Sequence, residues 1–530
     1  MHRPDALVDA PEAAVGTTIV GPTSGAFDLK QRLDDLTGRI TMYRLVLLGL
    51  GVIGVAAVVI SATGDLTYSL GEIIVSAILL VSVTYVSNQI FAGMFAVRPH
   101  TESTFITAAL LFFLFQPSTD SKALVAMAVA AIVASGSKYL LGVRGRHLFN
   151  PAAIGAVWVS LFGIGDAGWW VANPILVWVT LVVAALVLYR TRRLPLGALF
   201  VAIALVIIMA RTLSDGADPS AAFQAVFTSY PILFFAGFML SEPLTLPPLK
   251  WQQYLVAAVA AVIFSVPITV GSVFLGPEYA LVIANLVAFG FGQRRGISLV
   301  LQKRTQLTAD TFVFSFRPRK PVSFQAGQYL ELTLPHKGAD ARGSRRVFSI
   351  ASAPGDDESI RLAMKIPTNS STFKRELARL RNGDALTATT VGGDFLLPKD
   401  PAIPLLMIAG GIGITPFLSQ LQHRAAGPGN DGVVVVYAVG SPSDLSHVEE
   451  LERSGATVIV SGPDDSRGLP ASWRFAGPGR VDGAKLSRHV PDIAARQVFV
   501  SGPPAMVNAV RSGLRAMGVR KVKADYFSGY

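Results

Sequence analysis

The sequence contains no cysteine and only seven histidines among its 530 residues. Without cysteine, the chain can form no disulfide, no catalytic thiol, no cysteine-based zinc site and no thiolate-held iron–sulfur cluster. Charged residues are also scarce at 15 %, whereas apolar residues reach 51 % and the mean hydropathy is +0.49. This composition is too apolar for an ordinary soluble protein, and the length is too great for one domain. It predicts a membrane protein with a soluble part attached.

The formal charge of +11 raises the question of a nucleic-acid partner. No basic stripe with interleaved aromatic residues is present, and much of the positive charge in the apolar half lies at the ends of apolar runs. We therefore expect no nucleic acid and assign this charge to membrane orientation. Residues 1–42 are polar and lack the pattern of a signal peptide, which predicts a disordered cytoplasmic tail.

The apolar runs after this tail predict a polytopic α-helical bundle with ten spans. The expected spans are 44–62, 73–96, 103–115, 122–141, 150–164, 172–190, 196–212, 229–240, 252–271 and 279–293. Lys and Arg gather in the segments that an N-terminus-inside topology places in the cytoplasm. An even number of spans then returns the chain to the cytoplasm, so we expect a multi-pass protein of the inner (plasma) membrane with both termini inside.

Two of these apolar runs are too short to cross about 30 Å of hydrocarbon as helices. "TESTFITAALLFFLFQP" is third in the first five spans, and "SYPILFFAGFMLSEPLTLPP" is third in the second five. Short elements at matching positions predict an inverted repeat with broken helices, although tilted or re-entrant helices without a ligand fit equally well. Glu102 and Glu242 lie at these spans, which leaves open a redox-driven sodium transporter or two carboxylates solvated at the interface.

Three stretches of the apolar half carry a specific resemblance: "FAVRPHTESTFITAALLFF", "SGSKYLLGVRGRHLFNPAAIGAVWV" and "FAGFMLSEPLTLPP". They resemble signature stretches of the integral-membrane flavin subunits of the Rnf complex and of the sodium-translocating NADH:quinone oxidoreductase. The resemblance implies that residues 43–296 form an inverted-repeat domain that carries flavin and passes electrons across the membrane. Asn150 and Pro151 open a span whose free N–H groups suit a carbonyl-bearing or anionic ligand, or they form only a helix cap.

One departure from this family concerns a second flavin. The family carries a threonine esterified to FMN phosphate, and the matching stretch "GWWVANPILVW" places Asn173 there, which has no hydroxyl. The resemblance then implies no covalent FMN, and a second flavin, FMN or riboflavin, would be held noncovalently, with Trp169 or Trp170 as a stacking face. An empty site with both tryptophans in an interfacial aromatic belt is the alternative.

From residue 297 onward the pattern changes to short strands and turns, which predicts an antiparallel β-barrel over residues 297–400. "SRRVFSIASAP" resembles the Arg-x-Tyr-Ser motif of ferredoxin–NADP reductase-type FAD domains. The resemblance implies that Arg346 binds the FAD pyrophosphate, that Phe348 packs on the isoalloxazine and that Ser349 reaches flavin N5 as a catalytic residue. Three hydroxyls precede an amphipathic helix whose N-terminus suits a pyrophosphate, unless they only cap it: Ser370, Ser371 and Thr372.

Residues 401–530 alternate strands and helices, which predicts an α/β domain that binds NAD(P)H. In "PLLMIAGGIGITPFLSQLQHR" a glycine-rich turn joins strand to helix, and its candidate phosphate-binding residues are Gly410, Gly411, Gly413, Thr415 and Pro416. "VFVSGPPAM" resembles the reductase family's Cys-Gly-Pro-x-x-Met stretch beside the nicotinamide. That resemblance implies a catalytic Ser501 with Gly502 and Pro503, and the terminal "DYFSGY" implies that Tyr530 covers the flavin.

These features together predict a membrane-bound flavoprotein that takes hydride from cytoplasmic NAD(P)H onto FAD. Electrons would pass into or across the membrane to a quinone, a flavin or an extracytoplasmic flavoprotein, with membrane lipid around the helices. A haem-containing ferric reductase or NADPH oxidase needs paired histidines within spans, and the apolar half has only His100 and His147, at cytoplasmic ends. We expect no metal site. The choice between NADH and NADPH depends on whether Ser466 and Arg467 meet a 2′-phosphate, and it stays open.

Overall fold

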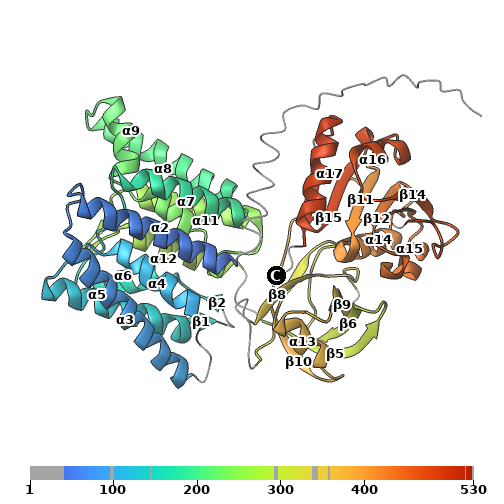
Figure 1. Ribbon diagram of the computed structural model, residues 1–530, viewed down its shortest axis with the longest axis horizontal. Coiled ribbons are helices and arrows are strands. Elements are labelled where there is room, and N and C mark those ends of the chain that lie inside the picture. The colour runs from blue at the N-terminus through green and yellow to red at the C-terminus, as the bar shows by residue number, and fades with distance from the viewer. Residues whose placement is uncertain are drawn as a thin grey trace, which may run out of the picture.

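A computed structural model describes residues 41–95, 99, 101–143, 146–271, 273–291, 296–336, 344–355, 359–462, 464–519 and 521–527. Figure 1 shows a helical part, coloured blue to green, beside two sheets with their own helices, coloured yellow to red. The expected tail lies outside the described residues except for its last two.

The helical part covers the chain from Met42 to Gly290. Its helices are α2 (Met42–Ala62), α3 (Leu70–Met94), α4 (Thr101–Leu114), α5 (Ser121–Leu140), α6 (Pro151–Leu161), α7 (Leu176–Arg190), α8 (Leu194–Ser214), α9 (Pro219–Thr228), α10 (Ile232–Phe234), the π-helix η1 (Phe235–Met239), α11 (Lys250–Ser265) and α12 (Pro277–Gly290). Two short hairpins join them, β1 (Gly142–Val143) with β2 (Arg146–His147), and β3 (Thr269–Val270) with β4 (Val273–Phe274). Local sequence explains several helix starts: Ser69 and Glu72 form a capping box, and Asp120 and Asp218 cap α5 and α9.

Every predicted span coincides with a helix, but the expected count of ten spans is not confirmed. Among the described residues, four helices are long and apolar enough to cross a membrane (α2, α3, α5 and α8), or five if the pair α9 and α10–η1, bent by 49°, counts as one. The apolar helices α4, α6, α7 and α12 have 11 to 15 residues, so they reach only about 16 to 23 Å. The apolar runs continue past these helix ends into irregular chain, which is why the sequence overstated their length.

The two short elements at matching positions of the halves meet in the core of the helical part. The ring centroids of Phe113 in α4 and Phe234 in α10 lie 5.4 Å apart. Gly237 of η1 packs so closely on α7 that an added Cβ would lie 2.9 Å from the Cα of Ala184. The two halves therefore meet through aromatic rings, and small residues allow close packing within the second half.

The first sheet begins directly after the helical part. It contains β5 (Ile297–Gln306), β6 (Thr311–Pro318), β7 (Tyr329–Thr333), β8 (Arg345–Ser349), β9 (Ile360–Lys365) and β10 (Ala385–Gly392), with helix α13 (Thr372–Arg379) between β9 and β10. The order is β8-β7-β10-β5-β6-β9, and every registered pair is antiparallel. A bridge between Ile350 and Leu362 links the two edges. Full closure into a barrel stays a prediction.

The second sheet is parallel throughout. It contains β11 (Leu405–Gly410), β12 (Val433–Ala438), β13 (Thr457–Gly462), β14 (Arg474–Pro478), β15 (Gln497–Gly502) and β16 (Val522–Tyr526), in the order β14-β13-β12-β11-β15-β16. Its helices are η2 (Gly411–Ile414), α14 (Thr415–Ala425), η3 (Pro442–Asp444), α15 (Val448–Arg453), α16 (Gly483–His489), η4 (Ile493–Ala495) and α17 (Pro504–Ala516). The order reverses between β11 and β15, and ligands of such sheets bind at the carboxyl ends of the strands at this reversal.

Candidate flavin and coenzyme site

Two glycine-containing turns meet at the reversal point of the parallel sheet. Gly411 has a positive φ of +52°, which glycine adopts without strain, and begins the turn between β11 and α14. A Cβ on Gly413 would contact the carbonyl oxygen of Ser501 and lie 2.8 Å from the Cα of Gly502. Gly502 also has a positive φ, and a Cβ there would lie 3.1 Å from the nitrogen of Gly410. The structure therefore brings together two motifs that are about 90 residues apart in sequence.

Ser501 is completely buried at the end of β15, where it pairs in register with Ala409. Its hydroxyl has no hydrogen-bond partner among the described residues. A buried hydroxyl without a partner is costly, so a ligand that supplies a partner is favoured. The carboxamide of a nicotinamide has both donor and acceptor groups and fits this position.

Thr415 and Pro416 start α14 and are both buried. The Thr415 hydroxyl donates to the carbonyl oxygen of Ile412 at 3.1 Å. In this arrangement the hydroxyl closes the turn from inside and is buried within it.

On the flavin side, Arg346 of β8 lies beside the first turn of α13. Only 4 % of its surface is exposed, and its Nη1 donates to the carbonyl oxygen of Arg345 at 2.6 Å. Its guanidinium carbon lies 5.4 Å from the ring centroid of Phe373, the second residue of α13. A guanidinium beside a helix N-terminus is a donor set that matches a pyrophosphate.

The other predicted flavin residues have defined places around this point. Ser371 caps α13 by accepting from the backbone N–H of Lys374, and Ser370 donates to the carbonyl oxygen of Pro367. Thr372 is the first residue of α13, and Ser349 is buried at the end of β8. Phe348 packs in the core of the antiparallel sheet, with its ring 5.9 Å from that of Phe373, so its ring faces a neighbouring side chain.

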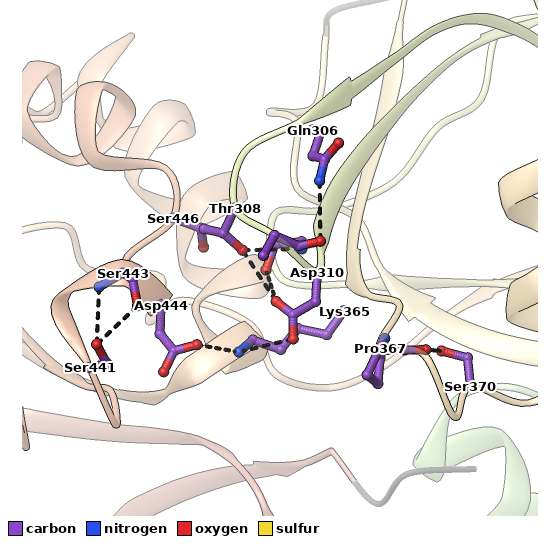
Figure 2. Close-up of polar contacts among 12 residues, drawn as sticks. Gln306, Thr308, Asp310, Lys365, Pro367, Ser370, Ser441, Ser443, Asp444 and Ser446 are labelled. Atoms are coloured by element: carbon purple, nitrogen blue, oxygen red, sulfur yellow. Dashed lines mark hydrogen bonds and ion pairs between the residues drawn. The ribbon is translucent and has the colours of Figure 1, made fainter.

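Ion pairs join the two sheets, and the sequence analysis missed them. Figure 2 shows Lys365 of β9 between Asp310, at 3.6 Å, and Asp444 beside β12, at 3.0 Å. Burial opposes the charge of Lys365, but the hydrogen bond and charge of Asp444 raise its pKa overall. Glu450 pairs with Arg361 of β9. No local motif could have revealed these contacts, because the partners are 79 and 89 residues apart.

Glu450 also accepts a hydrogen bond from His447, with Nδ1 and Oε2 2.8 Å apart. Burial would raise the pKa of this carboxyl, but His447 and Arg361 outweigh it and hold the pKa below its ordinary value. The carboxylate is therefore charged at neutral pH, and it holds the two sheets together.

In the helical part, the predicted ligand residues Asn150 and Asn173 accept hydrogen bonds from nearby backbone N–H groups. Asn150 is buried, and its Oδ1 accepts from the N–H groups of Ala152 and Ala153 at 3.0 and 3.2 Å. The Oδ1 of Asn173 accepts from Ile175 and Leu176 in the turn before α7. The cap alternative therefore describes Asn150, whereas Asn173 closes the turn that leads into α7.

Trp169 and Trp170 are buried in the core of the helical part, which argues against the alternative of an interfacial aromatic belt. The indole N–H of Trp169 donates to Oε2 of Glu278 at 2.8 Å, and that of Trp170 donates to the carbonyl oxygen of Phe112. A belt requires rings at the membrane interface, whereas these rings are covered by protein.

A cavity of about 70 Å³ lies between the two halves and is lined by Tyr43, Ser103, Asn150, Ser241 and Glu242, among others. Sites for drug-sized ligands usually have about 300 Å³ or more, so this cavity is small by comparison, and neither Asn173 nor the two tryptophans line it. His147 lies 3.5 Å from Glu242, and His100 is outside the described residues.

Two further predictions concern Tyr530 and the pair Ser466 and Arg467. Tyr530 lies outside the described residues. The backbone N–H of Phe527 donates to the carbonyl oxygen of Gly502 at 2.8 Å, so the terminal strand ends beside the turn formed by Ser501, Gly502 and Pro503. Arg467 forms an ion pair with Asp465 at 2.5 Å, next to Ser466. Among the described residues, no group of three or more His, Asp or Glu side chains could hold a metal ion.

Comparisons with known proteins agree with this geometry. Residues 407–512 match the oxidoreductase NAD-binding domain family. The chain is 27 % identical over 247 residues to the toluate 1,2-dioxygenase electron transfer component of Pseudomonas putida, covering 44 % of this chain and 68 % of that protein. It is 32 % identical over 216 residues to the 2-halobenzoate 1,2-dioxygenase electron transfer component of Burkholderia cepacia, covering 39 % and 58 %.

A third relative is the NADH oxidoreductase HCR of Escherichia coli, 25 % identical over 223 residues, covering 42 % of this chain and 65 % of that protein. The chain thus spans between 58 and 68 % of the length of these relatives. Among solved structures, the Amycolatopsis cytochrome P450 reductase GcoB aligns with a TM-score of 0.38 at 23 % identity, covering 44 % of this chain and 70 % of that one.

The C-terminal part of the chain is therefore an FAD- and NAD-binding reductase module of the ferredoxin reductase type. This C-terminal part is an NAD(P)H-dependent flavin oxidoreductase module, with FAD and NAD(P)H as its cofactors.

Proposed function

We propose that this protein is a membrane-bound reductase that takes hydride from cytoplasmic NAD(P)H and delivers electrons to an acceptor in or across the membrane. The observation that carries the proposal is the direct contact between the reductase module and the helical part. β5 begins seven residues after α12 ends, and Lys250 of α11 lies 4.0 Å from Asp394 of the module. Such contact suits an electron donor that must stay close to its acceptor.

The surface of the helical part supports membrane insertion. Large apolar side chains point outward from its longest helices, including Leu48 of α2 at 59 % exposure, Ile78 of α3 at 62 % and Val206 of α8 at 66 %. Water would oppose such a surface, whereas lipid accommodates it. A multi-pass location in the inner (plasma) membrane, with the module in the cytoplasm, is part of the proposal.

Different residues of the module would bind FAD, the coenzyme phosphates and the nicotinamide. Arg346 and the N-terminus of α13 would hold the FAD pyrophosphate, and bound FAD would accept a two-electron hydride and release single electrons. The turn around Gly411 and Gly413 lets the coenzyme phosphates approach backbone N–H groups. The buried hydroxyl of Ser501 would orient the nicotinamide, and Ser349 would stand at the flavin.

The test uses the full chain reconstituted in liposomes, with NADH outside and a quinone dissolved in the bilayer. We expect NADH-dependent quinone reduction, and reduction of ferricyanide trapped inside the vesicles if electrons cross the bilayer. Protein-free vesicles with the same additions provide the control. Rapid reduction of external ferricyanide, with neither the quinone nor the trapped acceptor reduced, would contradict the proposal.

A second candidate, redox-driven ion transport, is favoured by one observation. Glu242 lies in the cavity between the two halves, with His147 3.5 Å away, and buried carboxylates in membrane proteins often serve ion paths. Sodium uptake into sealed vesicles on addition of NADH, abolished by Glu242→Gln, would support transport. Sodium uptake that is independent of both NADH and the Glu242→Gln substitution would exclude redox-driven transport.

A further inference from the structure

The helical part contacts the terminal strand of the reductase module through a stacked pair of side chains. Arg192, in the turn between α7 and α8, places its guanidinium carbon 3.2 Å from the ring centroid of Tyr526, the last residue of β16. Tyr526 pairs in register with Gly502, and the next residue, Phe527, donates to the Gly502 carbonyl oxygen. The contact is thus one strand away from the turn assigned to nicotinamide.

Tyr526 also supports the helix that follows this turn. Its hydroxyl accepts from Nη1 of Arg511 at 2.6 Å and lies 3.4 Å from Oδ1 of Asn508, and both partners belong to α17. The helix α17 begins at Pro504, directly after the Ser501–Pro503 turn. Tyr526 therefore contacts both β15, which precedes this turn, and α17, which follows it.

The backbone of Arg192 argues that its side chain has a role. Its φ is +59°, and it lies where helices commonly end with glycine: the N–H of Arg193 donates to the carbonyl oxygen of Leu188 at 2.8 Å, as in a Schellman motif. Glycine adopts this conformation more easily than arginine. The contact of its guanidinium with the ring of Tyr526 explains why arginine occupies this position.

The helical part also contacts this face of the module at neighbouring residues. Lys250 lies 4.0 Å from Asp394, and a Cβ on Gly392 would lie 2.9 Å from Cβ of Pro248. Lys523 of β16 donates to the carbonyl oxygen of Leu396 at 2.6 Å, so the segment 392–396 and β16 form one surface.

We infer that Arg192 is a positioning residue for the coenzyme: by stacking on Tyr526, the helical part holds the end of β16 and with it the Ser501–Pro503 turn. This inference rests on the proposed assignment of that turn to nicotinamide. It makes coenzyme affinity depend on a residue of the helical part that the coenzyme does not touch.

The test is the steady-state rate of the full chain with NADH and ferricyanide. Arg192→Gly removes the stack and suits the positive φ, so folding is retained, and KM for NADH should rise about two- to fivefold with little change in kcat. Tyr526→Leu should raise KM at least as much, and the double variant should be no worse than Tyr526→Leu alone.

Lys250→Ala is the matched control, because it removes a cation from the same face without touching Tyr526, and its KM should equal that of the wild type. The inference is overturned if Arg192→Gly leaves KM unchanged, if the two single effects multiply in the double variant, or if Lys250→Ala reproduces the change. Ferricyanide takes electrons without a bilayer acceptor, so these outcomes do not depend on whether electrons reach the membrane.

Discussion

Gly413→Ala tests whether the two turns at the reversal point form the coenzyme site. A methyl group at Gly413 would contact the Ser501 carbonyl oxygen and lie 2.7 Å from its carbonyl carbon and 2.8 Å from Cα of Gly502. All these atoms belong to the backbone at the end of a central strand, so they cannot rotate away. Overpacking of this kind costs about 1–3 kcal/mol. If the turns separate to relieve it, coenzyme affinity falls by roughly 5- to 150-fold.

Gly411→Ala is the matched comparison within the same turn. A Cβ there meets no atom within 4 Å, but the φ of +52° strains alanine by about 1–2 kcal/mol. Both variants should lose some thermal stability, whereas only Gly413→Ala should lose most of its NADH affinity. Stopped-flow flavin reduction at varied NADH gives the affinity, and the flavin absorbance reports the FAD content. A Gly413→Ala protein with normal FAD and normal NADH affinity would refute the assignment.

Three further outcomes are expected. Arg346→Ala should lower FAD affinity about 100-fold or more, because a buried charge-assisted partner of the pyrophosphate is lost, and Arg346→Lys should have an intermediate effect. Ultrafiltration followed by flavin fluorescence measures the FAD affinity. Retention of stoichiometric FAD by Arg346→Ala would contradict the site. The lowered pKa of Glu450 stabilises the folded state fully above the ordinary carboxyl value of 4.5, and this contribution disappears as pH falls through the lowered value, so melting temperatures should fall less steeply with acid in Glu450→Gln. Because Asn173 has no hydroxyl, denaturing electrophoresis of protein from its native host should show no ultraviolet-fluorescent band, and such a band would disprove the absence of covalent FMN.

Local patterns were sufficient for much of the reductase module. The alternating strand of "ISLVLQKRTQ" forms β5 over Ile297–Gln306, and the apolar strand, glycine turn and helix around Gly411 form as predicted, because each signal lies within a few neighbouring residues. Local patterns did not predict the lengths of the apolar helices correctly. Apolar composition does not distinguish a helix from irregular apolar chain, such as the chain that continues beyond Leu161 or the chain that precedes Leu176.

The sequence by itself determined that the chain joins an apolar helical part to a module for FAD and NAD(P)H, since composition and short motifs carry that information without reference to distant residues. Only the tertiary structure decided which residues meet across long separations: Ser501 against the Gly413 turn, Lys365 between Asp310 and Asp444, and Arg192 on Tyr526. It also decided that Asn150 caps a helix, that Asn173 closes a turn and that Trp169 is buried. These outcomes depend on packing between elements, which burial and excluded volume decide only after the chain has folded.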